Sequence, residues 1–193
     1  MQNITVKDLM LSLDEYATVR DDASLYEAVK ALEKSQKEFD REKHLYHHRA
    51  ILVFDQNKKI IGKISQLDVL KALEPKYRDM GDFDAISRSG LSVEFIKSIM
   101  GRYDLYQRPF AEMCMAASDL RVKDIMYTPG SDEYVEENDS LGHAIHHLIM
   151  GHHQSLLVTR DKEIVGILRL TDVFNEVFQT MEAKKLEGKS ARK

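Results

Sequence analysis

The chain has 193 residues, of which 43 % are apolar and 31 % are charged, and it carries a net charge of −4. We expect a cytoplasmic globular protein, because no run approaches the roughly eighteen apolar residues of a membrane span, the N-terminus lacks a secretory pattern, and the lone Cys114 cannot form an internal disulfide. The acidic balance also argues against binding to a nucleic-acid polymer or an anionic membrane.

The first half of the chain predicts alternating strands and helices. After a polar insert at 33–48, the continuously apolar run at 50–54 is typical of a strand buried on both faces. A turn then leads to a second strand containing Gly62 and to a helix that begins near Asp68. Before the insert, a helix begins at Ser24, a good N-cap residue, and its apolar positions recur at helical spacing: Leu25, Ala28, Val29 and Leu32.

The middle of the chain, 75–120, is too long for a plain linker and predicts two helices. The second of them can begin after Pro109, where FAEMCMAA follows. These helices could cap the sheets, form a dimer interface or receive another protein, and apolar helical stripes usually bury against their own chain. The first helix is indicated by apolar residues at helical spacing: Leu91, Phe95, Ile96, Ile99, Met100 and Tyr103.

The second half repeats the first half in the same order. Its own helix begins at Ser140, and its second strand and following helix keep one spacing with the first copy, Gly62 to Asp68 and Gly166 to Asp172. Three further segments recur, namely VKDLM at 6–10 as VKDIM at 122–126, SLYEAVKAL at 24–32 as SLGHAIHHL at 140–148, and ILVF at 51–54 as LLVT at 156–159. We therefore divide the chain into four parts: repeat 1 (1–74), a helical connector (75–120), repeat 2 (121–181) and a charged flexible tail (182–193).

These matched segments resemble a tandem pair of CBS (cystathionine-β-synthase) domains, over roughly 4–74 and 121–181. The resemblance implies an α/β fold in which two β-α-β-β-α units pack sheet to sheet with pseudo-twofold symmetry and leave two clefts between them. It also implies a flat homodimer, formed through the helices that carry Val69, Leu70, Leu73, Val173, Phe174 and Val177.

In this family the segment after the second strand often reads G-h-x-[S/T]-x-x-D, with a further Ser or Thr often just before the Asp. Repeat 1 keeps Ser65 but has Leu67 before its aspartate, whereas repeat 2 has Arg169 in place of the first hydroxyl and keeps Thr171. The aspartate could accept hydrogen bonds from a ribose, and Arg169 could clamp a phosphate. Alternatively, both aspartates could be simple helix N-caps.

By resemblance, each cleft would mix residues from both repeats. Arg49 is the expected phosphate donor, whereas its counterpart Gln154 is neutral, and we expect the cleft with Asp172 to be the better nucleotide site. The ligand-binding residues implied in this way are Ala17, Thr18, His48, Arg49, Ala50, Ser65, Asp68, Val135, Gln154, Ser155, Arg169, Thr171 and Asp172.

The leading hypothesis is a stand-alone regulatory, energy-sensing module that binds AMP, ATP, S-adenosylmethionine or NAD and signals to an unknown effector protein. It requires no cofactor, and we expect no catalysis, because the sequence has no nucleophile beside an evident base and no glycine-rich phosphate loop. A second hypothesis is a ligand-free dimeric scaffold. A third is metal binding by His143 and His147, which share a helix face with His146; two helical histidines without a third fixed ligand are a weak signal.

Overall fold

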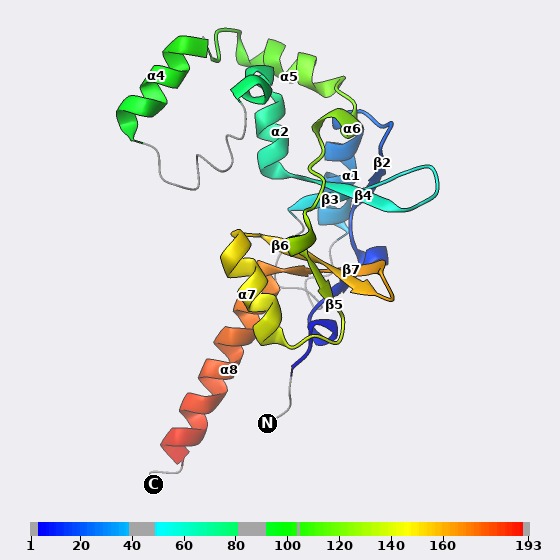
Figure 1. The fold of residues 1–193 in the computed structure, drawn as a ribbon, viewed down its shortest axis with the longest axis vertical. Coiled ribbons are helices and arrows are strands. Elements are labelled where there is room, and N and C mark those ends of the chain that lie inside the picture. Colours follow the sequence, from blue (N-terminus) through cyan, green and yellow to red (C-terminus); the bar gives the residue numbers. More distant parts are fainter. Residues whose placement is uncertain (1–3, 39–48, 81–91, 104, 191–193) are drawn as a thin grey trace. The chain divides into compact units, whose positions relative to one another are not determined.

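The computed structural model describes residues 4–38, 49–80, 92–103 and 105–190. By its internal contacts the chain forms two compact units (Figure 1). Unit 1 takes its residues from 1–17, 33–48 and 128–193, and unit 2 takes its residues from 18–32 and 49–127. The fold is therefore mixed α/β with two separate sheets, as the sequence predicted. How the units are placed on one another, including the expected sheet-to-sheet packing, stays a prediction.

Unit 2 contains the strands and helices expected of repeat 1. Strand β2 runs parallel to β3, and β4 runs antiparallel to β3. Ser24 caps the first helix, since its Oγ accepts from the backbone N–H of Glu27 at 3.2 Å. The elements are β2 (Thr18–Arg20), α1 (Leu25–Lys37, whose last turn is assigned to unit 1), β3 (Ala50–Phe54), β4 (Ile60–Ser65) and α2 (Gln66–Ala72).

Unit 1 contains the same arrangement built from repeat 2, with one additional strand. The order of its sheet is β1-β7-β6-β5. Ser140 caps α7 by accepting from the N–H of His143 at 3.2 Å. The elements are β1 (Leu11–Ser12), β5 (Tyr134–Glu136), α7 (Leu141–Gly151), β6 (Ser155–Arg160), β7 (Glu163–Arg169) and α8 (Leu170–Ser190), with short 3₁₀ turns η1 (Val6–Asp8), η2 (Leu13–Glu15) and η4 (Ser131–Glu133).

The duplication extends to the register of the strands. Val53 pairs with Gly62 in unit 2, and Val158 pairs with Gly166 in unit 1. In both sheets the pairing shifts directly after that valine, which marks a β-bulge at the same place. The predicted repeat is thus confirmed strand by strand.

Each unit is completed by a segment that precedes the other repeat, and we call residues 4–12 and 120–127 the exchanged segments. In unit 1, Val6 N–H donates to Asp139 O at 3.0 Å and Leu141 N–H donates to Ile4 O at 3.0 Å. Further along, Leu11 pairs antiparallel with Ile167. The first exchanged segment therefore runs from the start of α7 to the edge of the sheet.

The second exchanged segment makes equivalent contacts in unit 2. Val122 N–H donates to Ala23 O at 2.8 Å, and Leu25 N–H donates to Leu120 O at 2.8 Å. Tyr127 and Lys63 then form an antiparallel bridge with two 2.9 Å hydrogen bonds. Sequence analysis found the similarity of these segments but not their exchange.

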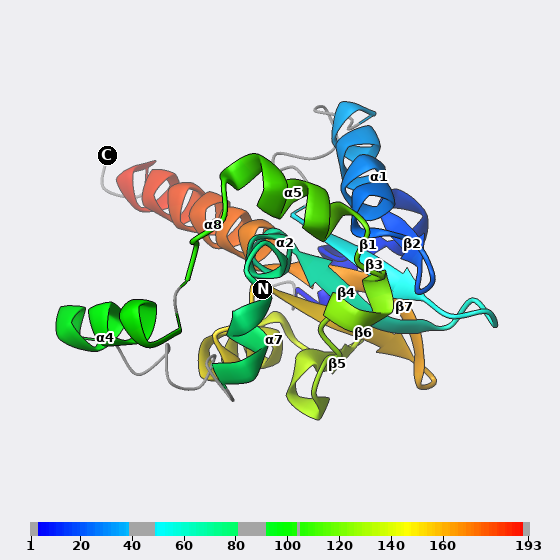
Figure 2. The same ribbon diagram turned by 90° about the horizontal axis from the view of Figure 1, so that it is seen from above.

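The core of unit 1 lies between its sheet and the helices α7 and α8, which pack on one side of the sheet in both views (Figures 1 and 2). Its buried residues are Val6, Val135, Ala144, Leu148, Leu156, Val158, Leu168 and Val173. In unit 2, Ile51, Leu52 and Val53 of β3 are fully buried, as the apolar run predicted. Helix α8 continues past residue 181 to Ser190, through a segment rich in the good helix formers Ala, Glu, Lys and Leu.

The connector contains the two predicted helices, and the second one packs on its own unit. Ala117 of α5 is buried against Leu25 of α1 and Ala72 of α2. Glu74 is only 3 % exposed and accepts a hydrogen bond from the backbone N–H of Tyr106 at 2.8 Å. This contact holds the loop that precedes α5. The connector elements are η3 (Pro75–Met80), α4 (Val93–Tyr103) and α5 (Phe110–Ser118), and α6 (Val122–Ile125) follows them in the exchanged segment.

Candidate functional site

In unit 2, several predicted ligand-binding residues meet at one end of the sheet. Ala50 opens β3 and pairs with Ser65, the last residue of β4. Gln66 N–H, at the start of α2, donates to Arg49 O at 3.2 Å. Arg49, Ala50, Ser65 and Asp68 are therefore neighbours, and Thr18 lies on the adjacent strand β2 opposite Leu52. His48, the remaining candidate from this part of the chain, lies outside the described residues.

Asp68 takes part in a capping box at the start of α2. Its Oδ2 accepts from Ser65 N–H at 2.8 Å and from Ser65 Oγ–H at 2.6 Å, while Asp68 N–H donates to Ser65 Oγ at 3.2 Å. The N-cap itself is thus Ser65, and Asp68 is the third helical residue. Within the described part of the chain Asp68 Oδ1 has no hydrogen-bond donor, so half of this carboxylate is available to a ligand.

Unit 1 brings the equivalent residues together at the same end of its sheet. Ser155 pairs with Arg169 in the β6–β7 register, and Leu170 N–H donates to Gln154 O at 3.0 Å. Thr171 and Asp172 follow in the first turn of α8, both partly buried. Ala17 and Val135, predicted to wrap a ligand, are buried at 6 % and 3 % exposure, so their side chains are not presented to solvent.

Arg169 occupies the position of the capping serine and pairs with Asp172. Its Nε donates to Asp172 Oδ2 at 2.5 Å and its Nη2 donates to Asp172 Oδ1 at 2.6 Å. The pair is mostly buried, with 6 % of the Arg169 side chain and 17 % of the Asp172 side chain exposed. Both carboxylate oxygens are therefore engaged. Sequence analysis assigned Arg169 to a phosphate and Asp172 to a ribose without foreseeing this contact.

The exchanged segments explain the paired glycines without reference to a ligand. A Cβ on Gly166 would overlap the carbonyl oxygen of Leu11, and a Cβ on Gly62 would lie 2.7 Å from Met126 Sδ and 3.0 Å from Tyr127 O. Each glycine thus leaves room for the backbone that crosses its strand.

A second ion pair, which sequence analysis missed, anchors the first exchanged segment. Arg160 donates from Nε and Nη2 to the two oxygens of Glu137, each at 2.6 Å, and this holds the pKa of Glu137 below its ordinary value. The carbonyl oxygen of Glu137 accepts from Lys7 N–H at 2.9 Å. Because Glu137 and Arg160 are far apart in sequence and follow no motif, no local signal could have identified the pair.

The described residues lack two further features. They contain no group of three or more His, Cys, Asp or Glu side chains placed to hold a metal ion. None of their helices combines the length and the apolar character that crossing a membrane requires.

Comparison with known proteins agrees with this geometry. The CBS domain family matches residues 6–75 and 122–179. A CBS domain-containing protein of unknown function from Bacillus anthracis is 21 % identical, with a TM-score of 0.59 over 92 % of this chain and 95 % of that one. CBSX2, solved in complex with AMP, is 21 % identical, with a TM-score of 0.54 over 92 % of this chain and 98 % of that one.

A CBS-domain protein of Agrobacterium tumefaciens is also similar, at 18 % identity, with a TM-score of 0.55 over 91 % of this chain and 96 % of that one. No curated protein sequence is matched. Because the family covers well over half of the chain, in two copies that correspond to the two sequence repeats, the chain belongs to the CBS domain family and carries two CBS domains in tandem.

Proposed function

We propose that this tandem CBS pair is a regulatory module that binds an adenine nucleotide and passes its occupancy to an effector protein. The observation that carries the proposal is the placement of Asp68 and Asp172, which lie in the first helical turn after β4 and β7 respectively, beside the residues at the end of each sheet. A carboxylate at such a position suits the two hydroxyls of a ribose. The structurally similar CBSX2 was solved in complex with AMP, which favours this ligand class.

Binding of a charged nucleotide would separate the Arg169–Asp172 ion pair. The guanidinium can exchange the carboxylate for a phosphate, and the carboxylate can exchange the guanidinium for ribose hydroxyls, so each charge keeps a partner. An uncharged nucleoside offers nothing to Arg169. We therefore expect AMP and ATP to bind more tightly than adenosine.

The proposal is tested by thermal unfolding of the full chain with AMP, ATP, S-adenosylmethionine, NAD and adenosine. A ligand that binds only the folded protein raises its stability by about 2.7 kcal/mol at a hundredfold excess over the dissociation constant. We expect AMP or ATP to raise the midpoint temperature of unfolding, and adenosine to raise it less. No shift with any of the five would overturn nucleotide binding.

The alternative, a ligand-free dimeric scaffold, is favoured by the Arg169–Asp172 pair, which engages both carboxylate oxygens of Asp172 without a ligand. Each unit presents an exposed apolar side chain to a second copy, because Leu70 on α2 and Phe174 on α8 are 58 % and 63 % exposed at equivalent positions of the two repeats. Of the other apolar residues on these helices, Val173 is buried in the core of unit 1 and is not presented to a second copy. Val69 and Leu73 pack partly against the core of unit 2.

A further inference from the structure

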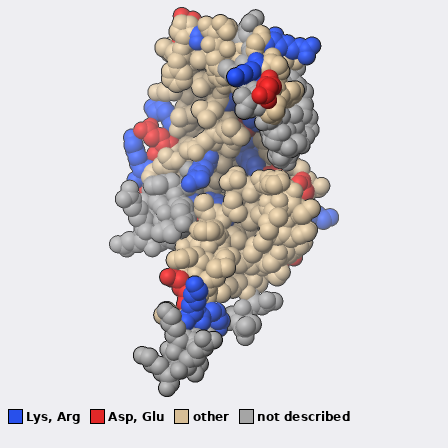
Figure 3. Space-filling view, turned by 90° about the vertical axis from the view of Figure 1, so that its left-hand side faces the viewer, with Lys and Arg blue, Asp and Glu red and all other residues tan. Residues whose placement is uncertain are grey.

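Two histidines of α7 face each other one turn apart on the side of the helix away from its core. His143 and His147 have ring centroids 4.8 Å apart, and their Nε2 atoms are separated by 3.3 Å. Half of the His143 side chain is exposed. Helix α7 contains no Asp, Glu, Lys or Arg, and the surface view shows a broad area of unit 1 without such side chains (Figure 3). The histidines are therefore the polar groups of this helix.

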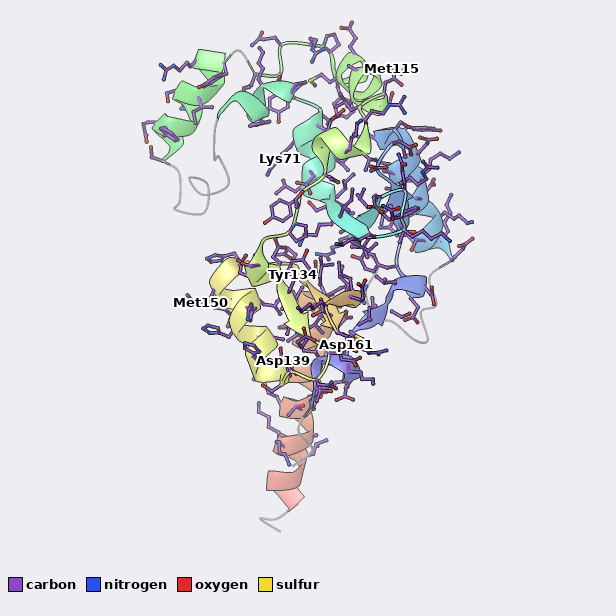
Figure 4. The ribbon with its side chains drawn as sticks, turned by 45° about the vertical axis from the view of Figure 1, so that its right-hand side comes forward. Lys71, Met115, Tyr134, Asp139, Met150 and Asp161 are labelled. Atoms are coloured by element: carbon purple, nitrogen blue, oxygen red, sulfur yellow. The ribbon has the colours of Figure 1, made fainter. Side chains whose placement is uncertain are left out.

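The Nδ1 atom of each ring, which points away from the other ring, already has a hydrogen-bond acceptor. His147 Nδ1 lies 2.8 Å from the carbonyl oxygen of Asp132, which can only accept, so the neutral ring must carry its proton on Nδ1. His143 Nδ1 lies 3.2 Å from Asp139 Oδ2, and this carboxylate favours a proton on the same nitrogen. Figure 4 labels Asp139 just before the first turn of α7, where it can reach His143.

The acceptor of His147 is itself fixed. Asp132 belongs to η4, and its carboxylate Oδ2 lies 3.0 Å from Nε2 of His153, whose side chain is only 11 % exposed. The next residue, Glu133, is 1 % exposed. The carbonyl that orients His147 is thus held by a packed turn and not by a free loop, which keeps the ring in one orientation.

With both protons directed outward, the neutral rings point two lone pairs at each other across 3.3 Å, and no hydrogen bond can form between them. The alternative tautomer of His143 would donate to His147 but would turn a lone pair toward Asp139. Both lone pairs are satisfied either by a second hydrogen on His143, whose Nε2 then donates to His147 while its Nδ1 still faces Asp139, or by a metal cation between the rings. Two imidazole nitrogens at about 2.0–2.1 Å from a tetrahedral zinc ion are separated by about 3.3 Å, which is the observed distance.

We propose that His143 and His147 form a two-nitrogen site for a divalent transition-metal ion of the Zn²⁺ class, with water completing the coordination. Imidazole nitrogens suit Zn²⁺, Cu²⁺ and Ni²⁺, whereas Mg²⁺ and Ca²⁺ prefer oxygen ligands. Asp139 and the Asp132 carbonyl supply the outer partners that ligating histidines usually have. The equivalent positions of repeat 1 are Glu27 and Ala31, so the site belongs to unit 1 alone. It does not depend on nucleotide binding.

The test is calorimetric titration of the metal-free full chain with Zn²⁺. We expect one ion per chain, and at least tenfold weaker binding in His143→Ala and in His147→Ala. His146→Ala is the matched control, because it removes an exposed histidine of the same helix and should leave the affinity unchanged. Asp139→Asn should weaken Zn²⁺ binding by a smaller factor, because it removes the carboxylate that orients His143.

A second readout separates ligation from a structural role. In ¹H–¹⁵N spectra of the imidazole groups, Zn²⁺ should shift the Nε2 signals of His143 and His147 and leave their Nδ1 protons in place. Absence of Zn²⁺ binding by the wild-type chain would overturn the site. So would full affinity in the His143→Ala/His147→Ala double variant, or shifts confined to other histidines.

Discussion

At the scale of single residues, the pairing of Arg169 with Asp172 distinguishes the two CBS units most clearly. At the start of α2, unit 2 has the neutral hydroxyl of Ser65, which hydrogen-bonds with Asp68, whereas at the start of α8 unit 1 has Arg169, a residue that is only 5 % exposed. A buried charge depends on its partner far more than an uncharged cap does. The two aspartates therefore have different consequences for stability although they occupy the same position.

We expect Asp172→Ala to lower the free energy of unfolding by roughly 3 kcal/mol, because it leaves the Arg169 guanidinium buried without its carboxylate. Asp68→Ala removes a capping-box contact and should cost about 1 kcal/mol. Urea unfolding of both variants measures the difference. The double variant Arg169→Met/Asp172→Ala should recover much of the loss, and equal costs for the two single variants would contradict this account.

For binding, the conservative variants Asp172→Asn and Asp68→Asn are preferable because they keep the shape of the side chain. We expect Asp172→Asn to weaken the binding of AMP or ATP at least tenfold, equivalent to about 1.4 kcal/mol. Asp68→Asn should have a smaller effect on binding. Calorimetric titration decides between them. The reverse order would assign the stronger site to Asp68, whose Oδ1 already lacks a donor in the described structure.

At the scale of elements, the exchanged segments determine which glycines can be replaced. Gly166→Ala should lower the free energy of unfolding by about 2 kcal/mol, since its Cβ meets a backbone carbonyl that cannot move without breaking the Leu11–Ile167 pairing. Gly142→Ala is the control in the same unit, because its nearest neighbouring atom is 3.9 Å away and alanine favours a helix. A stable Gly166→Ala protein would mean that β1 does not pair with β7.

The anchor of the first exchanged segment should respond to acid. Arg160 lowers the pKa of Glu137 in the folded chain, so the pair stabilises the fold above the unfolded pKa of about 4.3. That stability is lost as the pH falls through the lower folded value. Wild type should therefore lose more stability than Glu137→Gln between about pH 5 and pH 3 in urea unfolding. Parallel curves for the two proteins would exclude this contribution.

The features that could be predicted from the sequence are those that leave a local pattern of side chains. The Ser24 and Ser140 caps, the buried run at 50–54 and the Gly–Asp spacing identified both units. The exchange could not be predicted, because contacts such as the hydrogen bond from Leu141 N–H to Ile4 O join backbone atoms of residues distant in sequence. The helical spacing of His143 and His147 was evident, but the tautomer of His147 depends on Asp132, which comes from another element.

At the scale of the whole molecule, the exposed apolar side chains of α2 and α8 predict self-association. Sedimentation at micromolar concentration should show a dimer, since two-fold pairs are the commonest soluble oligomers. Phe174 is 63 % exposed, and Phe174→Glu should shift the equilibrium toward the monomer because it places a charge in the expected contact. Tyr26→Glu, at an exposed position on α1, serves as the control. A monomeric wild type would leave these side chains without the expected partner.

The exchange of segments also bears on how such a chain can arise and be divided. A polypeptide holding one repeat would carry a leading segment that pairs with the other repeat in the tandem chain, so keeping these contacts would require a second molecule. Gene fusion of two such molecules would keep every backbone contact and remove the dependence on concentration. We therefore expect a single excised half to lose these contacts, whereas two separately expressed halves, mixed in solution, should reconstitute the pair.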